Sequence, residues 1–414
     1  MRRYFGGSAS FLLLALSYSR AGNTLTQYSD RLPWSTPSNA YALLLAERRH
    51  AGASLLDLTI SNPSEALADY PHADLARAYG EITDFTYQPA ALGIPQARLA
   101  IADWYAARAI PASAQRLAIT ASTSEAYSLL FKLLCNPGDE VLIPQPSYPL
   151  FEYLAKAEGV KTVPYRLSYD GGWFLDLDSV KRAISARSKA IVLVNPNNPT
   201  GSFLRKAELA ALQSLAIGHG LALLCDEVFM TYPAGEASGR VTTLIGQNEV
   251  LSFSLNGLSK AAGMPQMKLA WMAVNGPGDE VASALARLDL LLDNYLSVAT
   301  PVQQALGGLL RIGEAIHSNI DARLRQNRVA LQIMGDSPIE VLACEGGWSA
   351  ILRVPTVLTE DAWITNLLIE QNVVIQPGYF YDMVNEAYLV VSLLAKPEDF
   401  SVGIERLRQL AARY

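Results

Sequence analysis

Cysteine and histidine are scarce in this chain of 414 residues, which contains three of the first and four of the second. The cysteines, Cys135, Cys225 and Cys344, lie far apart and form no Cys-x-x-Cys spacing. This excludes a disulfide framework and a zinc site as first interpretations and favours a reducing compartment. The histidines are not spaced as metal ligands either, so we expect no metal centre.

An excess of positive charge is also missing. Lysine and arginine number 33 against 39 aspartates and glutamates, the net charge is −6, and no basic block occurs. Nucleic-acid binding is therefore a poor hypothesis, because it requires clustered positive charge. The apolar stretches near 220–225 and 286–292 are too short or too charged to span a bilayer. We expect neither nucleic acid nor a membrane among the partners.

The amino terminus is the one segment that resembles a targeting signal. The stretch MRRYFGGSASFLLLALSYSRAG has two arginines and then an apolar run of the length found in signal peptides. Arg20 interrupts the small-x-small pattern that a cleavage site needs. We therefore expect residues 1–23 to be an extension of a cytoplasmic protein, and the alternative is an exported form in which 1–22 is a signal.

The hydrophobic pattern predicts two lobes. Half of the residues are hydrophobic, which suffices for a large core. From about 96 to 300, helical stretches alternate with runs such as AIVLVN and LALLCDE, which are apolar on both faces and typical of buried parallel strands. Past about 310 we expect a smaller α+β lobe, with antiparallel strands in IEVLACEGGWSAILRVP, a helix at 359–371 and a strand in AYLVVSLL.

Three predicted strands end in polar, irregular segments: VNPNNPTG at 194–201, DEVF at 226–229 and SLNGLSK at 254–260. Because the carboxyl ends of parallel strands carry the chemistry of α/β folds, we expect these segments to form one site. Lys260 lies there among small and apolar residues. Loss of hydration would lower its pKa and make the amine a nucleophile toward an aldehyde. The alternative is a lysine whose charge reaches solvent from the start of a helix.

In this order, NPNNPTG, DEV and LSK resemble the class I and II aminotransferases of fold type I, which use pyridoxal 5′-phosphate. The resemblance covers about residues 30 to 414. It implies an α/β fold with a mostly parallel seven-stranded sheet in a large domain at 64–305, a smaller α+β domain at 306–414, and an arm at 24–63 that joins the smaller domain. The implied reaction moves an amino group between an amino acid or amine and a keto compound through a Schiff base on Lys260.

The resemblance gives roles to individual residues. Lys260 binds the cofactor and then moves a proton, while Asp226 keeps the ring nitrogen protonated, since opposite charge favours the charged form. The ring can then take up electrons. Asn198 bonds the ring oxygen and helps to position the substrate, and Tyr148 stacks on the ring. The alternatives are a helix cap for Asp226, a turn residue for Asn198 and a core aromatic for Tyr148. Glu227 is interpreted as structural.

A phosphate site is expected ahead of the apolar helix in TASTSEAYSLLFKLL. A helix start with hydroxyls and a cation suits a phosphate, and by resemblance these are Ser122, Thr123, Ser124, Ser259 and Lys268. A plain serine and threonine cap is the alternative. Lysine at 268 keeps the charge of the arginine usual in the family but loses its two-pronged geometry.

Tyr87 in YQPAALG resembles a tyrosine that reaches the phosphate of the partner subunit. The resemblance therefore implies a homodimer with a shared active site, with the segment NYLSVATP at 294–301 at the same interface. Asn62 in SNP corresponds to a residue that lines the substrate side.

Two positions depart from the family pattern. Phe229 stands where a tyrosine is usual, and Val390 stands where an arginine forks onto the substrate carboxylate. Arg353 is a conceivable substitute, although its alternation with apolar neighbours predicts that it faces solvent. How the carboxylate is bound stays open. A β-lyase, decarboxylase or racemase, and a non-catalytic cofactor-binding sensor domain, therefore remain alternatives to a transaminase.

Overall fold

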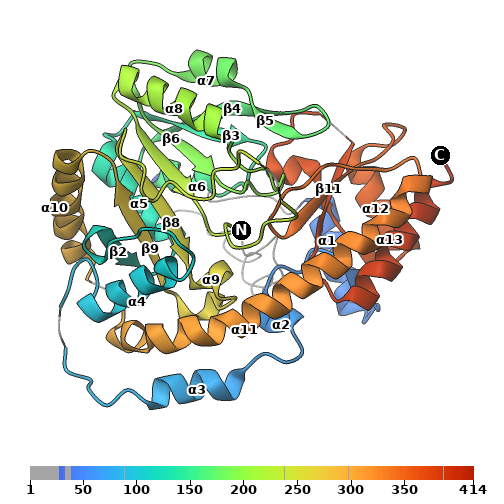
Figure 1. Ribbon diagram of the computed structural model, residues 1–414. Helices are drawn as coiled ribbons and strands as arrows, with labels where there is room; N and C mark the ends of the chain where they lie inside the picture. Colours follow the sequence, from blue (N-terminus) through green and yellow to red (C-terminus); the bar gives the residue numbers. More distant parts are fainter. Residues whose placement is uncertain (1–27, 33–38, 88, 237, 297, 386) are drawn as a thin grey trace, which may run out of the picture.

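The computed structural model describes residues 28–32, 39–87, 89–236, 238–296, 298–385 and 387–414 (Figure 1). The predicted N-terminal extension, residues 1–23, lies outside these described residues, as does part of the predicted arm at 24–63.

A mixed sheet forms the centre of the larger lobe. In the described residues it has eight strands in the order β2-β9-β8-β7-β6-β3-β4-β5. The strands are β2 (Leu117–Thr120), β3 (Glu140–Gln145), β4 (Lys161–Tyr169), β5 (Trp173–Leu175), β6 (Ser188–Val194), β7 (Ala222–Asp226), β8 (Ser252–Gly257) and β9 (Ala270–Asn275). Strands β8, β7, β6, β3 and β4 are parallel to one another, whereas β9 is antiparallel to β2 and β8.

The prediction of a mostly parallel α/β sheet is confirmed, and the structure adds one strand to the seven expected. The addition is β5, which returns antiparallel along β4. Asp170, Gly171 and Gly172 form the turn between them, and Gly171 has a φ of +64°, a left-handed conformation that glycine adopts without steric cost. A three-residue strand is too short to give a periodic signal, so the prediction did not include it.

Helices cover both faces of this sheet because successive strand residues point to opposite sides. In β6, Val192 packs in a cluster with residues of α5 (Thr123–Leu134), α6 (Phe151–Ala157) and α10 (Gly278–Tyr295). Its neighbours Ile191 and Leu193 pack instead with α7 (Leu177–Ala183) and α8 (Lys206–His219). The apolar runs read from the sequence are therefore buried on both sides, as predicted.

The smaller lobe is built on a sheet in the order β10-β11-β14-β13. Its elements are β10 (Glu340–Val341), β11 (Ser349–Arg353), α12 (Glu360–Glu370), β12 (Val373–Val374), β13 (Gln376–Pro377), β14 (Tyr388–Ser392) and α13 (Pro397–Ala411). The antiparallel strands and the helix at 359–371 were predicted and are confirmed. Strand β1 (Leu56–Asp57), which follows α1 (Ala40–His50), pairs with β12. The exact domain boundaries stay predictions.

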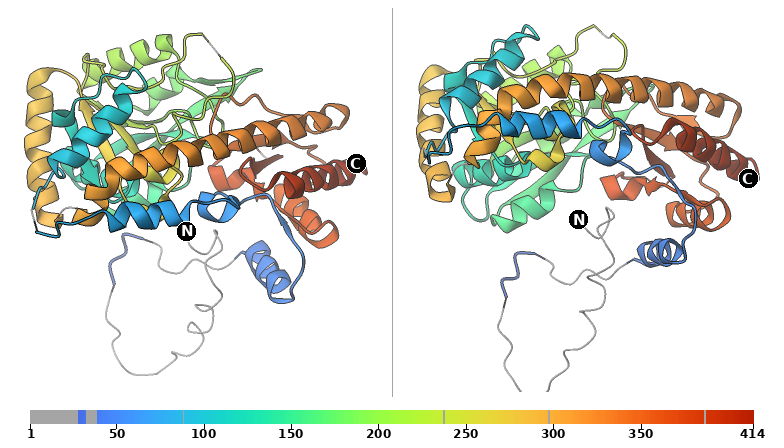
Figure 2. Two further views of the ribbon diagram at one scale, coloured as in Figure 1. Left: turned by 60° about the horizontal axis from the view of Figure 1, so that its bottom comes forward. Right: turned by 90° about the horizontal axis from the view of Figure 1, so that it is seen from below.

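Helix α11 (Thr300–Ala330) runs along both lobes, from α3 (His72–Gly80) and α4 (Pro95–Ala106) to α13 (Figure 2). Two four-residue helices, α2 (Pro63–Ala66) and α9 (Leu258–Ala261), lie against α11. None of the helices in the described part of the chain combines the length and the apolar character that a membrane crossing requires.

Candidate functional site

The carboxyl ends of β6, β7 and β8 meet at one edge of the large sheet. The pairing register sets Val194 beside Asp226 and Asp226 beside Leu255. On the antiparallel side, Ala270 of β9 lies beside Gly257 of β8. The segments NPNNPTG, DEV and LSK all continue from this edge, so the structure brings together the three motifs that the sequence predicted to form one site.

Lys260 lies in α9, directly after β8. Its Nζ is 4.5 Å from the ring centroid of Trp348 and 5.5 Å from that of Phe229. Burial lowers the pKa of Lys260 from 10.5 to about 8, while the nearby charge of Asp226 acts to raise it. At pH 7 roughly one amine in ten is thus neutral, and the neutral amine is the form that attacks an aldehyde.

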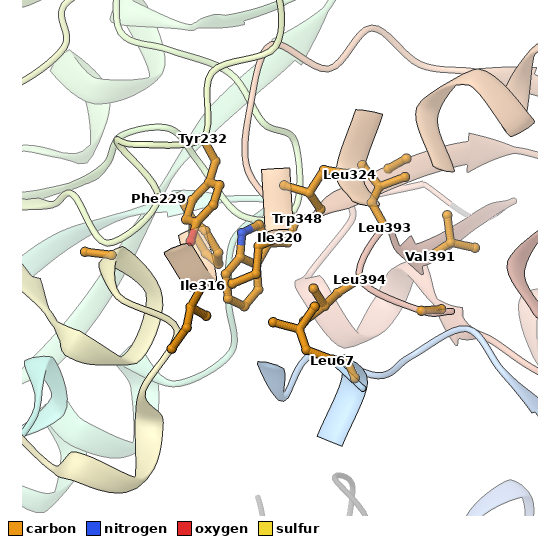
Figure 3. Packing of buried hydrophobic residues seen from close by; sticks show 14 of the residues in the cluster. Leu67, Phe229, Tyr232, Ile316, Ile320, Leu324, Trp348, Val391, Leu393 and Leu394 are labelled. Atoms are coloured by element: carbon orange, nitrogen blue, oxygen red, sulfur yellow. The ribbon is translucent and has the colours of Figure 1, made fainter. Parts of the chain in front are cut away.

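Phe229, Tyr232 and Trp348 form an aromatic wall (Figure 3), and the rings of Phe229 and Trp348 lie near the Lys260 amine. Phe229 and Tyr232 both meet the Trp348 ring edge-on, with centroids 5.4 and 5.3 Å away. The Tyr232 hydroxyl donates a hydrogen bond of 2.8 Å to the carbonyl oxygen of Lys260. Ile316 and Ile320 of α11 pack against the wall from behind. The wall therefore fixes the Lys260 main chain and shields its side chain from water.

No motif in the sequence predicted a role for Trp348. It lies on the loop before β11, in the smaller lobe, and no spacing rule links it to a lysine at the end of a strand in the larger lobe. Its position directly after two glycines, Gly346 and Gly347, was the only local signal.

Asp226 is the last residue of β7. Its Oδ1 accepts a hydrogen bond of 3.1 Å from the backbone N–H of Val228. Burial raises the pKa of Asp226 to about 6, and the backbone of Val228, the hydroxyl of Tyr127 and the charge of Lys260 each lower it. The carboxylate is thus ionised at neutral pH and available to a cationic partner.

Glu227 has the structural role that we predicted. Its carboxylate is fully buried and accepts hydrogen bonds from the Thr243 hydroxyl, the Leu244 backbone N–H and the Ser254 hydroxyl, at 2.7, 2.7 and 3.0 Å. Burial raises the pKa of Glu227 to about 7, against the pull of these donors. It anchors the segment after β7 and leaves Asp226 to face the site.

Asn198 is held by the loop that follows β6. Within this loop, the Asn195 amide group donates to the Val241 carbonyl oxygen at 2.7 Å and the Thr200 hydroxyl donates to Asn197 at 3.0 Å. Asn198 accepts a long hydrogen bond of 3.3 Å from the hydroxyl of Ser349, which follows Trp348. The predicted turn chemistry is therefore present, and the Asn198 side chain is half-buried.

The start of α5 lies at the same edge of the sheet. Ser122 is its N-cap, with Oγ accepting from the Glu125 backbone N–H at 3.1 Å, so this hydroxyl has the capping role given as the alternative. The hydroxyls of Thr123, Ser124 and Ser259 have no partner among the described residues. Lys268, which is exposed, precedes β9 in a left-handed conformation with φ of +50°.

Three more predicted site residues, Tyr148, Tyr87 and Asn62, come from other segments of the described chain. Tyr148 packs beside a small cluster that contains Val390, and burial raises its pKa to about 12. The ring of Tyr87 is 67% exposed on the surface of the single chain. Asn62 caps α2, and its Oδ1 accepts from the backbone and the hydroxyl of Ser64 at 3.2 and 2.8 Å. Their functional roles stay predictions.

Val390 lies in β14 with only 1% of its surface exposed. It pairs with Ile351 of β11 and packs with Leu342 and Tyr381. Arg353, the conceivable substitute for a carboxylate-binding arginine, forms an ion pair with Glu340 and has half of its side chain in solvent, as predicted. The surroundings of position 390 are thus apolar and aromatic.

Known proteins resemble this chain over most of its length. The model of a family described as aminotransferase class I and II matches residues 54–407. The glutamate-pyruvate aminotransferase AlaA of Haemophilus influenzae is 27% identical over 392 residues, which are 91% of this chain and 95% of that protein. The alanine aminotransferase of Mycobacterium tuberculosis is 28% identical over 300 residues, or 70% of each chain.

Solved structures share the fold. An aminotransferase from Escherichia coli superposes with a TM-score of 0.81 at 23% identity, over 94% of this chain and 99% of that one. The alanine aminotransferase from Pyrococcus furiosus gives a TM-score of 0.80 at 23% identity, over 91% and 100% of the two chains. The predicted α/β fold with a second α+β lobe is confirmed.

Proposed function

The chain belongs to the class I and II aminotransferases and is a transaminase dependent on pyridoxal 5′-phosphate, and on that premise we propose that Lys260 carries the cofactor and moves the proton of the reaction. The proposal rests on the surroundings and the pKa of the Lys260 amine. The amine is shielded by an aromatic wall, its pKa is about 8, and it interacts with the buried carboxylate of Asp226. Burial favours the neutral form of the Lys260 amine, and the charge of Asp226 acts in the opposite direction.

The residues at this edge of the sheet suit the cofactor. Asn197 Nδ2 is a buried polar atom without a hydrogen-bond partner among the described residues, which is typical of a polar ligand site. In our proposal, Asp226 faces the ring nitrogen, Asn198 the ring oxygen and Tyr148 the ring face. The phosphate lies at the start of α5, held by Ser122, Thr123, Ser124, Ser259 and Lys268, with Tyr87 reaching it from a partner subunit.

When bound, pyridoxal 5′-phosphate supplies an aldehyde for the amino group and a ring that takes up electrons from the α-carbon. The protein supplies the proton transfers. Asp226 is ionised above about pH 6 and holds a proton on the ring nitrogen facing it. Lys260, once its amine is free, takes a proton from the α-carbon of the substrate and returns it one position along. Burial of the amine keeps it partly neutral.

We propose that the amino donor needs no carboxylate paired with a cation at position 390, because Val390 is buried among apolar and aromatic side chains. A carboxylate would be desolvated there among Ile351, Leu342 and Tyr381 without a paired cation, which is costly. Asn62 and Asn198 then contact the substrate as neutral donors. The names of the relatives make alanine and glutamate the donors against which others are compared.

A donor screen tests this proposal. Purified enzyme is incubated with alanine, glutamate, their amides, and monoamines without a carboxylate, with pyruvate as acceptor, and the keto product and free ammonia are both measured. We expect a donor without an α-carboxylate to have the highest kcat/KM, with amino transfer and little ammonia. A higher kcat/KM for alanine or glutamate than for every such donor would contradict the proposed substrate class.

We further propose a homodimer with a shared active site. Supporting it, large apolar side chains are exposed near Tyr87 and at the end of α10, namely Phe85, Leu290, Tyr295 and Leu296. Mixing inactive Lys260→Ala protomers with Tyr87→Ala protomers tests the sharing. Hybrid dimers would contain one site with both native residues and should regain about a quarter to a half of native activity if each site uses both chains. No regain on mixing, with hybrids present, would refute it.

A cytoplasmic location is the proposal that suits the three cysteines, since all of them are free thiols in the structure. Fractionation of cells that express the full chain checks it, and recovery of the protein outside the cytoplasm would contradict it.

A further inference from the structure

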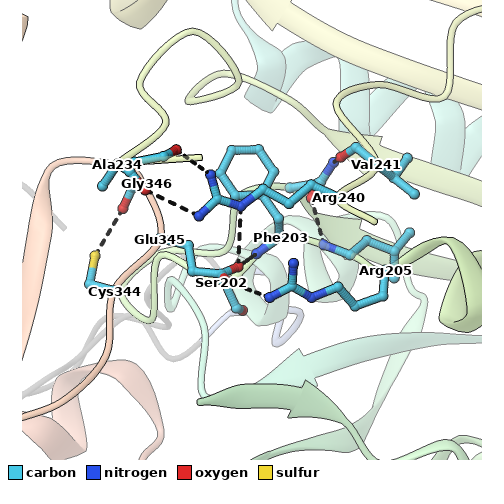
Figure 4. A network of polar contacts seen from close by, with 12 residues as sticks. Ser202, Phe203, Arg205, Ala234, Arg240, Val241, Cys344, Glu345 and Gly346 are labelled. Carbon is cyan, nitrogen blue, oxygen red and sulfur yellow. Dashed lines mark hydrogen bonds and ion pairs between the residues drawn. The ribbon is translucent and has the colours of Figure 1, made fainter. Parts of the chain in front are cut away.

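The loop between β10 and β11 crosses from the smaller lobe to the larger one, and Glu345 lies at its centre (Figure 4). The Glu345 carboxylate forms an ion pair with Arg205 through one oxygen. The other oxygen lies 3.7 Å from Nε of Arg240 and accepts a hydrogen bond of 3.3 Å from the backbone N–H of Phe203. The side chains of Glu345 and Arg240 are 25% and 12% exposed, so this clasp is partly withdrawn from solvent.

The residues beside Glu345 reach the site directly. The Gly347 backbone N–H donates to the carbonyl oxygen of Tyr232 at 2.9 Å, and the next residue is Trp348, whose ring faces Nζ of Lys260. The residue after that, Ser349, donates to Asn198. One short segment thus joins an ion-pair clasp at one end to two proposed site residues at the other.

The charges explain why the clasp holds this segment. One carboxylate lies between two guanidinium groups, so its negative charge offsets a repulsion between Arg205 and Arg240. Without that charge the two arginines would repel each other across the base of the loop. The hydrogen bond of 2.7 Å from the Ala234 backbone N–H to the Glu345 carbonyl oxygen would then have to hold the base of the loop against this repulsion.

We propose that Glu345 is a positioning residue, and that its clasp by Arg205 and Arg240 holds Trp348 over Lys260 and so keeps solvent from the Lys260 amine. The inference rests on the proposed role of Lys260 as the cofactor-binding residue. Neither Glu345 nor the two arginines needs to touch the substrate, because the clasp acts through the position of Trp348.

The test uses the full-length holoenzyme without substrate. Borohydride reduces the bond between the cofactor and its lysine, and the rate at which visible absorbance is lost reports how easily a small reagent reaches that bond. The clasp variant is Glu345→Gln. Its matched control is Glu340→Gln, which removes an exposed ion pair with Arg353 at the start of the same loop. Circular dichroism confirms that each variant is folded.

We expect Glu345→Gln to be reduced about fivefold faster than native enzyme, the change that a partly buried ion pair of about 1 kcal/mol supports. Glu345→Asp, which keeps the charge, should fall between the two, and Glu340→Gln should match native enzyme. A reduction rate for Glu345→Gln equal to the native rate overturns the inference. If Glu345→Gln does not fold, Arg205→Gln takes its place with the same expected direction, and an unchanged rate again overturns the inference.

Peptide mapping of the reduced native enzyme separates the two proposals. If the label is not on Lys260, the proposed function fails, and the clasp inference fails with it. If the label is on Lys260 and the clasp variants react at the native rate, the proposed function stands and the clasp inference alone fails.

Discussion

The lowered pKa of Lys260 predicts the pH at which cofactor-free enzyme becomes loaded. Attachment of pyridoxal 5′-phosphate requires the neutral amine, so its rate should follow the neutral fraction of Lys260. Burial lowers the pKa of this lysine from 10.5 to about 8. The rate should therefore rise with pH and level off just above pH 8, rather than continue to rise beyond pH 10.

The expected size of the effect follows from these two values. At pH 7, roughly one amine in ten is neutral when the pKa is about 8, against about one in three thousand when it is 10.5. Burial of Lys260 thus enriches the reactive form about 300-fold. The negative charge of Asp226 limits the enrichment, because it favours the ammonium.

Stopped-flow absorbance measures this directly. Cofactor-free enzyme is mixed with pyridoxal 5′-phosphate from pH 6 to 10.5, and Nα-acetyl-lysine is run in the same buffers to divide out the ionisation of the cofactor itself. The Lys260→Ala variant should give no fast phase at any pH. A midpoint near 10.5 for the native enzyme would refute the reasoning, since Lys260 would then be as well hydrated as a free lysine.

Three further predictions concern neighbouring residues. The folded-state pKa of Asp226, about 6, is above its ordinary 3.8, so the ionised group costs stability above about pH 6 and costs none below about pH 4. Calorimetry of the cofactor-free Asp226→Asn variant should therefore show a higher melting temperature than native enzyme at pH 8 but not at pH 4. The transaminase activity of this variant should fall at least about 100-fold. Equal melting temperatures at pH 8 would contradict this. Val390→Arg should raise kcat/KM for alanine about tenfold and lower the melting temperature, because a buried valine is replaced by a charge that only a carboxylate can pair with. Steady-state kinetics test this, and a native kcat/KM for alanine equal to that of the variant would contradict the prediction. Lys268→Met should weaken cofactor affinity about tenfold in equilibrium dialysis, as loss of one phosphate contact predicts, and unchanged affinity would exclude Lys268 from the phosphate site.

Local sequence signals sufficed for the residues that end apolar strands. Asp226 and Asn198 each follow a run that is apolar on both faces, Lys260 follows a strand that alternates polar and apolar residues, and the parallel register brings those ends to one edge. The same reasoning predicted helices on both faces and the antiparallel strands of the smaller lobe. These features depend on periodicity and strand direction, which can be recognised directly in the sequence.

Contacts between the lobes could not be predicted in the same way. Trp348 faces Lys260, and Glu345 meets Arg205 and Arg240, only because the loop before β11 folds back onto the larger lobe. Such contacts depend on tertiary packing rather than on spacing. Ser122 shows a different limit, since one serine ahead of a helix suits both a cap and a phosphate, and the structure uses its hydroxyl for the cap.

The central claim is that one amine, on Lys260, binds the cofactor. Reduction of the holoenzyme with borohydride, followed by proteolysis and mass spectrometry of the labelled peptide, tests it most directly. The account predicts one label per chain, on the lysine of the peptide that contains NGLSK. A label on any other lysine, or none in an enzyme that binds the cofactor, would contradict it.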